Sequence, residues 1–163
     1  MKYPVPDFSG TLKALSGILA KAEAHCVDNK IDPDELLKAQ LYPDMFNLIR
    51  NVQTSCDTAK GAAARLTGRE NPSFEDNETS FADLQARIAK TREFIHSVPE
   101  EDFEGADERK VVLKTGNGDL PFVGADYLAR FAYPNFYFHV TLCHAILRHK
   151  GVAIGKRDYL GAV

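Results

Sequence analysis

Asn135 and His139 are the polar residues best placed to do chemistry, because they lie one helical turn apart within an apolar pattern. The segment 134–150 repeats apolar residues at the period of an α-helix. Its inward stripe is expected to comprise Phe136, Val140, Cys143 and Leu147. Asn135 and His139 fall inside the same arc, so both are predicted to point toward the core, where an unpartnered polar group costs about 1–3 kcal/mol. A neighbouring helix must therefore supply their partners.

The chemistry open to this pair depends on what meets it. A buried imidazole can serve as a metal ligand or as a general base. It can also do no chemistry, if Asn135 and His139 only hydrogen-bond to Gln53, to a tyrosine or to a buried water and thereby fix the register of the helices. Gln53 and Asp57 flank the apolar stripe of an earlier helical segment. That segment is the first place to look for a partner.

Three cysteines, Cys26, Cys56 and Cys143, are the other reactive side chains. They are widely spaced, odd in number and without a C-x-x-C pair, which is typical of reduced thiols. Each lies on an apolar stripe, where a thiol usually behaves as a small hydrophobic group. Cys56 is the candidate for a reactive thiolate because Asp57 follows it. The sequence has no G-x-S-x-G, P-loop, dinucleotide-binding or H-E-x-x-H motif, so standard hydrolase, kinase and dehydrogenase machinery is not visible.

Long amphipathic helices are predicted to position these residues. The first carries apolar residues from Phe8 to about residue 28, with Ser9 as its cap, and a short helical turn is expected within 31–41. The second begins at about residue 43 and ends at Gly68. Small residues along its second half allow a neighbouring helix to approach closely. The third follows a capping box at Ser80 and ends near residue 97.

A small β-hairpin is predicted at residues 109–123, because two short apolar runs flank a Gly-Asn-Gly turn. A fourth helix is predicted to begin within 124–131 and to end at Gly151. Pro134, which follows its start, either kinks this helix or restarts it. The tail 152–161 is expected to pack along the bundle without a helix of its own. The predicted fold is all-α, an up-down four-helix bundle with the hairpin inserted before the last helix, in one domain spanning residues 1–163.

Composition narrows the functional classes. The chain has 163 residues, 44% of them hydrophobic, and a net charge of -3 from 20 basic and 23 acidic residues. Because the basic residues form no block, the electrostatic footprint of a nucleic-acid binder is missing. No signal-peptide pattern and no run of roughly 18 apolar residues occurs. We therefore expect a cytoplasmic protein with neither a nucleic-acid nor a membrane partner.

Five motifs, in order along nearly the whole chain, resemble the DUF1993 family: AQLYPDMF (39–46), AKGAAARL (59–66), FEDNET (74–79), PNFYFHVT (134–141) and GKRDYLG (155–161). The architecture is also similar to that of the wider group of DinB/YfiT-like four-helix bundles. The resemblance implies such a bundle but no assigned activity, because the DUF1993 family has none.

The wider group commonly binds a divalent metal through three histidines, one on the second helix and two in an H-x-x-x-H pair on the fourth, ahead of an L-R-x-x-G ending. The ending at 147–151 aligns His139 with the second histidine of the pair and places Asn135 at the first. The second helix has no histidine, so the resemblance leaves Gln53 or Asp57 as the third ligand, and spacing does not choose between them. Amides are poor ligands for zinc or nickel, whereas Asp57 and His139 could hold such an ion weakly with water at the remaining positions.

Two functional hypotheses follow. The favoured one is a non-catalytic small-molecule-binding or dimeric scaffold protein with a degenerate metal site. The alternative is a metal-dependent or thiol-linked transferase or hydrolase that uses His139 and Asp57. A homodimer is expected from the resemblance and from the aromatic cluster Tyr133, Phe136, Tyr137 and Phe138, which has more apolar surface than one face of a bundle needs.

Overall fold

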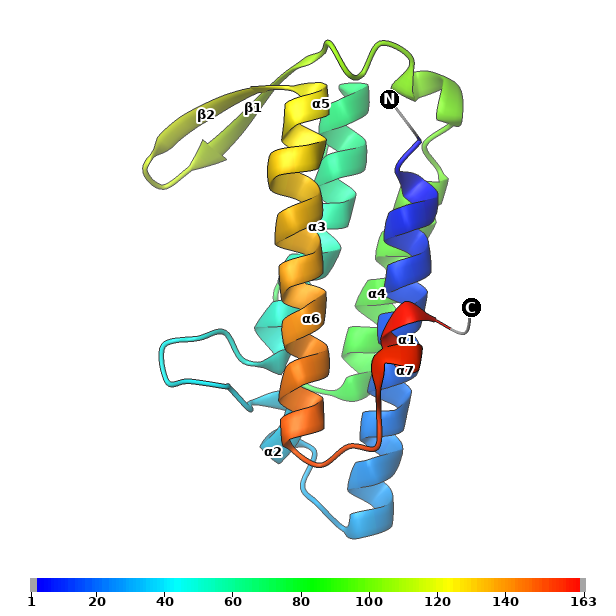
Figure 1. Ribbon diagram of the computed structural model, residues 1–163, viewed down its shortest axis with the longest axis vertical. Helices are drawn as coiled ribbons and strands as arrows, with labels where there is room; N and C mark the ends of the chain where they lie inside the picture. Colours follow the sequence, from blue (N-terminus) through cyan, green and yellow to red (C-terminus); the bar gives the residue numbers. More distant parts are fainter. Residues whose placement is uncertain (1–2, 162–163) are drawn as a thin grey trace.

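The computed structural model describes residues 3–161 and shows an up-down bundle of long helices (Figure 1). Three of them are α1 (Val5–Asn29), α3 (Leu48–Thr67) and α4 (Phe81–His96). The next is a continuous rod of α5 (Gly124–Asp126), the π-helical turn η2 (Tyr127–Ala132) and α6 (Tyr133–His149). Shorter elements are α2 (Asp34–Leu37), the 3₁₀ turn η1 (Glu100–Phe103) and α7 (Lys156–Leu160). The predicted all-α bundle is confirmed.

The core forms where the apolar stripes of the long helices meet. The most deeply buried side chains of α1 are large: Val5, Phe8, Leu12, Leu15 and Leu19. The second half of α3 carries small residues instead: Ala59, Ala62, Ala63 and Ala64, all fully buried. Because alanine side chains are short, α6 and η2 can pack closely against α3. No helix in the described part of the chain is long and apolar enough to cross a bilayer.

Pro134 neither breaks nor restarts the last long helix, because the preceding turn is wider than an α-helical turn. The N–H of Tyr133 donates to the carbonyl of Leu128, five residues back. Proline has no N–H to donate, so a single widened turn lets the chain pass Pro134 while the rod stays continuous (Figure 1). The helix is thus continuous past Pro134, so the proline does not restart it.

Two predicted helix starts were wrong, and a short helix in the tail was not predicted. Helix α1 begins at Val5, with Pro6 in its first turn, so Ser9 lies inside the helix and its Oγ is 2.7 Å from His96 Nε2 on α4. Helix α3 begins at Leu48 rather than near residue 43, because the Asn47 side chain caps it by accepting the N–H of Arg50 at 2.9 Å. The tail does pack along the bundle, against α1, but contains the short helix α7.

The hairpin is confirmed as β1 (Lys110–Thr115) paired antiparallel with β2 (Gly118–Val123), and it projects from one end of the bundle (Figure 1). It joins the last long helix at Gly124, whose N–H donates to the carbonyl of Arg109 at 2.8 Å. A Cβ built on Gly124 would lie 1.8 Å from the carbonyl oxygen of Ala106. Glycine at position 124 therefore lets the strand, the helix and the 104–109 segment meet.

We expect Gly124→Ala to lower the free energy of unfolding by about 2–3 kcal/mol, because its Cβ meets a backbone oxygen that cannot rotate away. Gly17→Ala is the matched control: Gly17 is exposed in the interior of α1, and nothing lies within 4 Å of its built Cβ. That control is expected to gain about 0.5–1 kcal/mol from helix propensity. Urea unfolding measures both. A Gly124→Ala variant as stable as the parent would contradict the close approach.

Candidate functional site

The candidate site is built around a hydrogen bond between His139 on α6 and Asn51 on α3. Nδ1 of His139 lies 2.8 Å from Oδ1 of Asn51. Asn51 is fully buried and His139 is 8% exposed. The Asn51 Nδ2 group donates to the carbonyls of Phe46 at 2.9 Å and Asn47 at 2.8 Å, which fixes the amide with its oxygen toward the imidazole. Nδ1 of His139 must then carry the proton, so the lone pair is on Nε2.

Aromatic rings enclose the imidazole on the outer side of this hydrogen bond. Phe46 stacks on His139 at 5.9 Å between centroids, and Phe138 meets it edge-on at 5.2 Å. The guanidinium of Arg50 lies over the Phe46 ring, 5.6 Å from its centroid. Burial, assisted by the charge of Arg50, lowers the pKa of His139 below its usual value. The imidazole is therefore neutral at neutral pH.

Asn135 has a separate partner. Its Nδ2 group donates to Oγ1 of Thr58 at 2.8 Å, two turns along α3 from Asn51. Because α3 and α6 run in opposite directions, the residue one turn earlier on α6 meets a residue further along α3. Asn135 and His139 thus both hydrogen-bond to α3. Their partners, Thr58 and Asn51, are residues that the sequence analysis did not single out.

Gln53 and Asp57 lie on a different face of α3, toward α4 and the loop 69–79. Gln53 donates to Glu78 at 2.8 Å, and Asp57 accepts from Arg87 at 2.9 Å. Lys60 lies 3.2 Å from the same Asp57 oxygen. The structure brings neither Gln53 nor Asp57 to His139. Asn51 could have been found, because it falls between Leu48 and Ser55 on the inward arc of α3.

Arg87 holds the loop 69–79 against α3 and α4. Its guanidinium is almost fully buried and contacts carboxylates of Glu78, Asp57 and Asp76 at 2.8, 2.9 and 3.0 Å. It also donates to the carbonyl of Glu75 at 3.0 Å. Asp76 in turn accepts from Arg50, which connects this ionic cluster to the aromatic rings around His139. The carboxylates and Arg87 neutralise one another within this cluster, and their ion pairs hold the loop 69–79 in place.

The cysteines are enclosed by the bundle. Burial raises the pKa of the Cys56 thiol to about 12, and burial also raises the pKa of Cys143. The carboxylate of Asp57, which follows Cys56, points into the ionic cluster with Arg87. Both thiols are therefore protonated at neutral pH and act as small core side chains.

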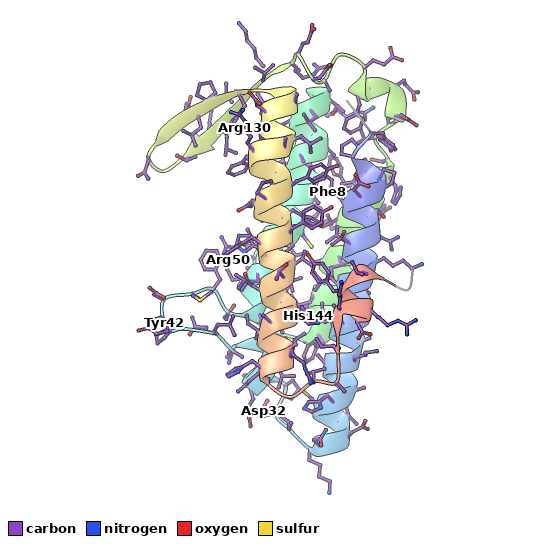
Figure 2. All side chains as sticks on the ribbon, in the orientation of Figure 1. Phe8, Asp32, Tyr42, Arg50, Arg130 and His144 are labelled. Atoms are coloured by element: carbon purple, nitrogen blue, oxygen red, sulfur yellow. The ribbon has the colours of Figure 1, made fainter. Side chains whose placement is uncertain are left out.

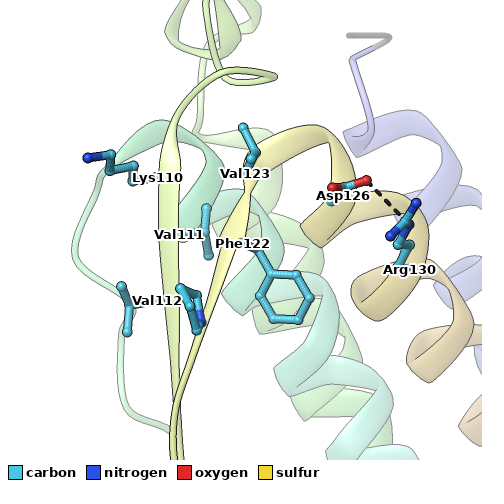
Figure 3. A pocket seen from close by; sticks show the side chains of 8 residues that line it. Lys110, Val111, Val112, Phe122, Val123, Asp126 and Arg130 are labelled. Carbon is cyan, nitrogen blue, oxygen red and sulfur yellow. Dashed lines mark ion pairs between the residues drawn. The ribbon is translucent and has the colours of Figure 1, made fainter.

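A mostly apolar hollow lies away from His139, between the hairpin and the start of the last long helix (Figure 3). It has a volume of about 630 Å³, and its walls are mostly apolar: Val111, Val112, Pro121, Phe122 and Val123. An exposed ion pair, Asp126 with Arg130 at 3.3 Å, stands at its edge. The hollow offers space but few polar groups. Because the Asn51–His139 pair supplies polar groups that can bind or react, we place the candidate site there.

The comparisons with known proteins agree with this architecture. Residues 2–160 match the family described as "Domain of unknown function (DUF1993)". The chain belongs to the DUF1993 family. It is also 43% identical to a DinB family member protein from Shewanella denitrificans, whose crystal structure superposes with a TM-score of 0.93. That match covers 99% of this chain and 92% of the other. No functionally curated protein matches.

Three of the motifs that resemble this family meet around the first turns of α3. The motif 39–46 ends at Phe46, the motif 74–79 supplies Asp76 and Glu78, and the motif 134–141 supplies His139. Arg50 links the first two, because it lies over the Phe46 ring and donates to Asp76. The motifs by which this chain resembles DUF1993 proteins therefore include His139 and Phe46 of the candidate site, but not Asn51.

The first prediction for this site concerns stability. We expect His139→Ala to cost about 1–4 kcal/mol, because it leaves the Asn51 oxygen without a donor and opens a cavity beside Phe46. His139→Gln is expected to recover part of that loss, since an amide N–H can replace the Nδ1 donor. Urea unfolding of the two variants measures the difference. An equal loss in both would argue against the hydrogen bond.

The second prediction concerns pH. The folded state disfavours the imidazolium form of His139, so the unfolded chain binds a proton more readily. Its contribution to stability is complete above the unfolded pKa of about 6.5 and falls as pH falls below it. His139→Gln is expected to flatten the stability profile between about pH 7.5 and pH 5.5, relative to the parent. His149→Gln, at an exposed position at the end of α6, serves as the matched control.

Proposed function

We propose that this chain acts by binding, as a small-molecule-binding or dimeric scaffold protein, and not as a metal-dependent catalyst. The observation that carries the proposal is the Asn51–His139 hydrogen bond. In that bond, the proton on Nδ1 and the oxygen of Asn51 satisfy each other. Both hydrogens of the Asn51 amide are donated to backbone carbonyls. The pair has the form of a completed structural contact.

The polar residues around His139 do not fit a metal. DinB-like proteins are associated with metal binding, and tetrahedral zinc sites use imidazole, thiolate and carboxylate ligands. Here His139 meets the amide of Asn51, and the amide of Asn135, one turn earlier on α6, donates to Thr58. Of these side chains, only His139 offers a strong metal ligand, the lone pair of its Nε2. Within residues 3–161, no three His, Cys, Asp or Glu side chains are grouped so that they could hold an ion.

The alternative function, a metal-dependent or thiol-linked transferase or hydrolase using His139 and Asp57, has less support. It needs Asp57 near His139, but the Asp57 carboxylate is paired with Arg87 and Lys60. Its thiol form needs a thiolate, but the pKa of Cys56 is about 12. For a binding role, in contrast, the hollow beside the hairpin has the volume and apolar walls typical of small-molecule sites.

Metal analysis tests this proposal. Protein purified without a His-tag is expected to hold far less than one equivalent of zinc, nickel or iron, and added zinc should leave its melting temperature unchanged. The variant Asn51→His/Asn135→His restores three imidazoles, and zinc at about 100 times its Kd would then add about 2.7 kcal/mol by linkage. Adding His139→Ala to that variant serves as the control and should abolish the gain.

Stoichiometric metal in the parent, lost in His139→Ala, would contradict the proposal and favour the alternative. A second sign against it would be a zinc-dependent rise in the parental melting temperature that Asp57→Asn removes. Asp57→Asn also weakens the ionic cluster around Arg87, so the comparison uses the zinc-induced shift of each protein and not its absolute melting temperature.

A further inference from the structure

The hairpin projects from the bundle as a sheet of two strands, so each strand has one edge that the other does not cover (Figure 2). Thr115 and Gly118 flank the two-residue turn and lie directly opposite each other, so they exchange both of their main-chain hydrogen bonds. Bonded and non-bonded pairs alternate along an antiparallel ladder. The residues of β1 whose N–H and C=O groups point away from β2 are therefore Lys110, Val112 and Lys114.

The two edges are not equivalent. Pro121 of β2 lies opposite Val112, and proline has no N–H, so the edge of β2 lacks its central donor. The edge of β1 keeps all of its donors, and no hydrogen bond between main-chain groups of residues 3–161 outside the ladder uses them. A complete row of unpaired N–H and C=O groups is a template for another strand. The hairpin is thus open along β1 and interrupted along β2.

The two faces of β1 differ in the same alternation. Val111 and Leu113 are buried, whereas Lys110 and Lys114 are exposed and Val112 is half exposed. In Figure 3, Lys110 and Val112 extend from β1 on the side away from the last long helix. A strand added beside β1 would therefore meet two lysines and a valine on its outer face and apolar side chains on its inner face.

We propose that the edge of β1 binds an extended acidic segment of another protein, which joins the hairpin as a third strand. In this mode of recognition, main-chain hydrogen bonds give affinity and alternate side chains give specificity. Lys110 and Lys114 share the outer face, and neither forms an ion pair within residues 3–161. An acidic side chain opposite each lysine makes a favourable cross-strand pair. Charge complementarity thus selects an acidic strand.

The same lysines disfavour a second copy of β1 as the occupant. Antiparallel addition centred on Val112 would set Lys110 of one copy opposite Lys114 of the other, and parallel addition in register would set each lysine opposite itself. Like charges directly opposite each other destabilise a pair of strands. Lysines on an edge strand are a common protection against self-association. Here they leave the edge available to a strand of opposite charge.

The hairpin is ordered before any partner arrives. At its tip, Oγ1 of Thr115 donates to the carbonyl of Gly118 at 2.8 Å and accepts the N–H of Asn117 at 3.2 Å. At its base, the N–H of Gly124 donates to the carbonyl of Arg109 at 2.8 Å. Because the edge is held at both ends, the protein loses little conformational entropy when a strand is added. An antiparallel strand could form about six main-chain hydrogen bonds with it, two at each outward residue.

A peptide of alternating charge and apolar residues tests the proposal. The inference deepens the binding role proposed above by naming a partner class, but peptide binding and metal content are separate measurements, so either can fail alone. The probe is acetylated and amidated (Glu-Val)3-Glu, titrated into the full chain by NMR. It is expected to shift the amide signals of Lys110, Val112 and Lys114. It should bind at least about tenfold more tightly than (Lys-Val)3-Lys, the control of opposite charge.

N-methylated probes separate strand addition from charge attraction alone. One edge of an added strand faces β1, so its N–H groups on that edge come from every second residue. We compare the probe with N-methyl groups on all its glutamates and the probe with N-methyl groups on all its valines, which have the same charge. One of the two is expected to lose binding and the other to keep it. Loss in both, or binding in both, would overturn the proposal.

Variants of the chain test the edge from the protein's side. Val112→Pro removes an outward N–H that makes no bond to β2, as Pro121 already does on the opposite strand, and is expected to weaken the probe about tenfold or more. Val112→Thr keeps the N–H and serves as the matched control. The double reversal Lys110→Glu/Lys114→Glu leaves the main chain intact and should exchange the preference, so that (Lys-Val)3-Lys binds more tightly.

The outcomes are decided by these comparisons. Retention of the parental amide spectrum outside the hairpin confirms that each variant is folded. The proposal is overturned if the parent does not bind (Glu-Val)3-Glu at millimolar peptide, or if it binds both charges equally. Equal binding by Val112→Pro and Val112→Thr would also overturn it. So would an unchanged charge preference in the double reversal, which does not depend on how the hairpin tolerates a proline.

Discussion

The close packing of α3 against α6 is the constraint on which the rest of this structure depends. Alanines along α3 bring the two helices together, and Asn51 is then fully buried beside an imidazole that is only 8% exposed. The Asn51 oxygen is satisfied by the Nδ1–H group of His139. The same Asn51 amide holds the carbonyls of Phe46 and Asn47, so one buried side chain ties α6, the cap of α3 and the end of the loop 38–47 together.

A second layer of constraint lies on another face of α3, toward α4. Arg87 is buried among carboxylates and holds the loop 69–79 down, and Phe74 of that loop lies beneath the ammonium groups of Lys60 and Lys90, each 4.2 Å from its ring. Removing one partner of such a buried charge is far more costly than its net contribution suggests. The acidic residues that might otherwise have served chemistry are therefore committed to fastening a loop.

Periodicity was sufficient to predict the long helices, the hairpin at 109–123 and the inward direction of His139, because each depends on a repeat that the residue order displays. It failed at helix starts: Met45 extends the apolar pattern backward, but the Asn47 side chain ends it by capping α3. It also failed to choose the partner of His139. Gln53 and Asp57 were predicted as partners because they are polar residues beside the apolar stripe of α3, whereas Asn51 lies within that stripe. The orientation of α3 about its own axis, relative to α6, decides which of the three side chains meets the imidazole.

The π-helical turn at Tyr127–Ala132 sets an angle as well as accommodating Pro134. One residue of an α-helix corresponds to a rotation of 100° and a rise of 1.5 Å. The extra residue therefore fixes the bearing at which the hairpin leaves the rod relative to Phe138 and His139 on α6. Losing or gaining a single residue there would swing the hairpin about a quarter of a turn around the bundle. A small insertion or deletion is thus a route by which such a fold could redirect an arm without altering its core.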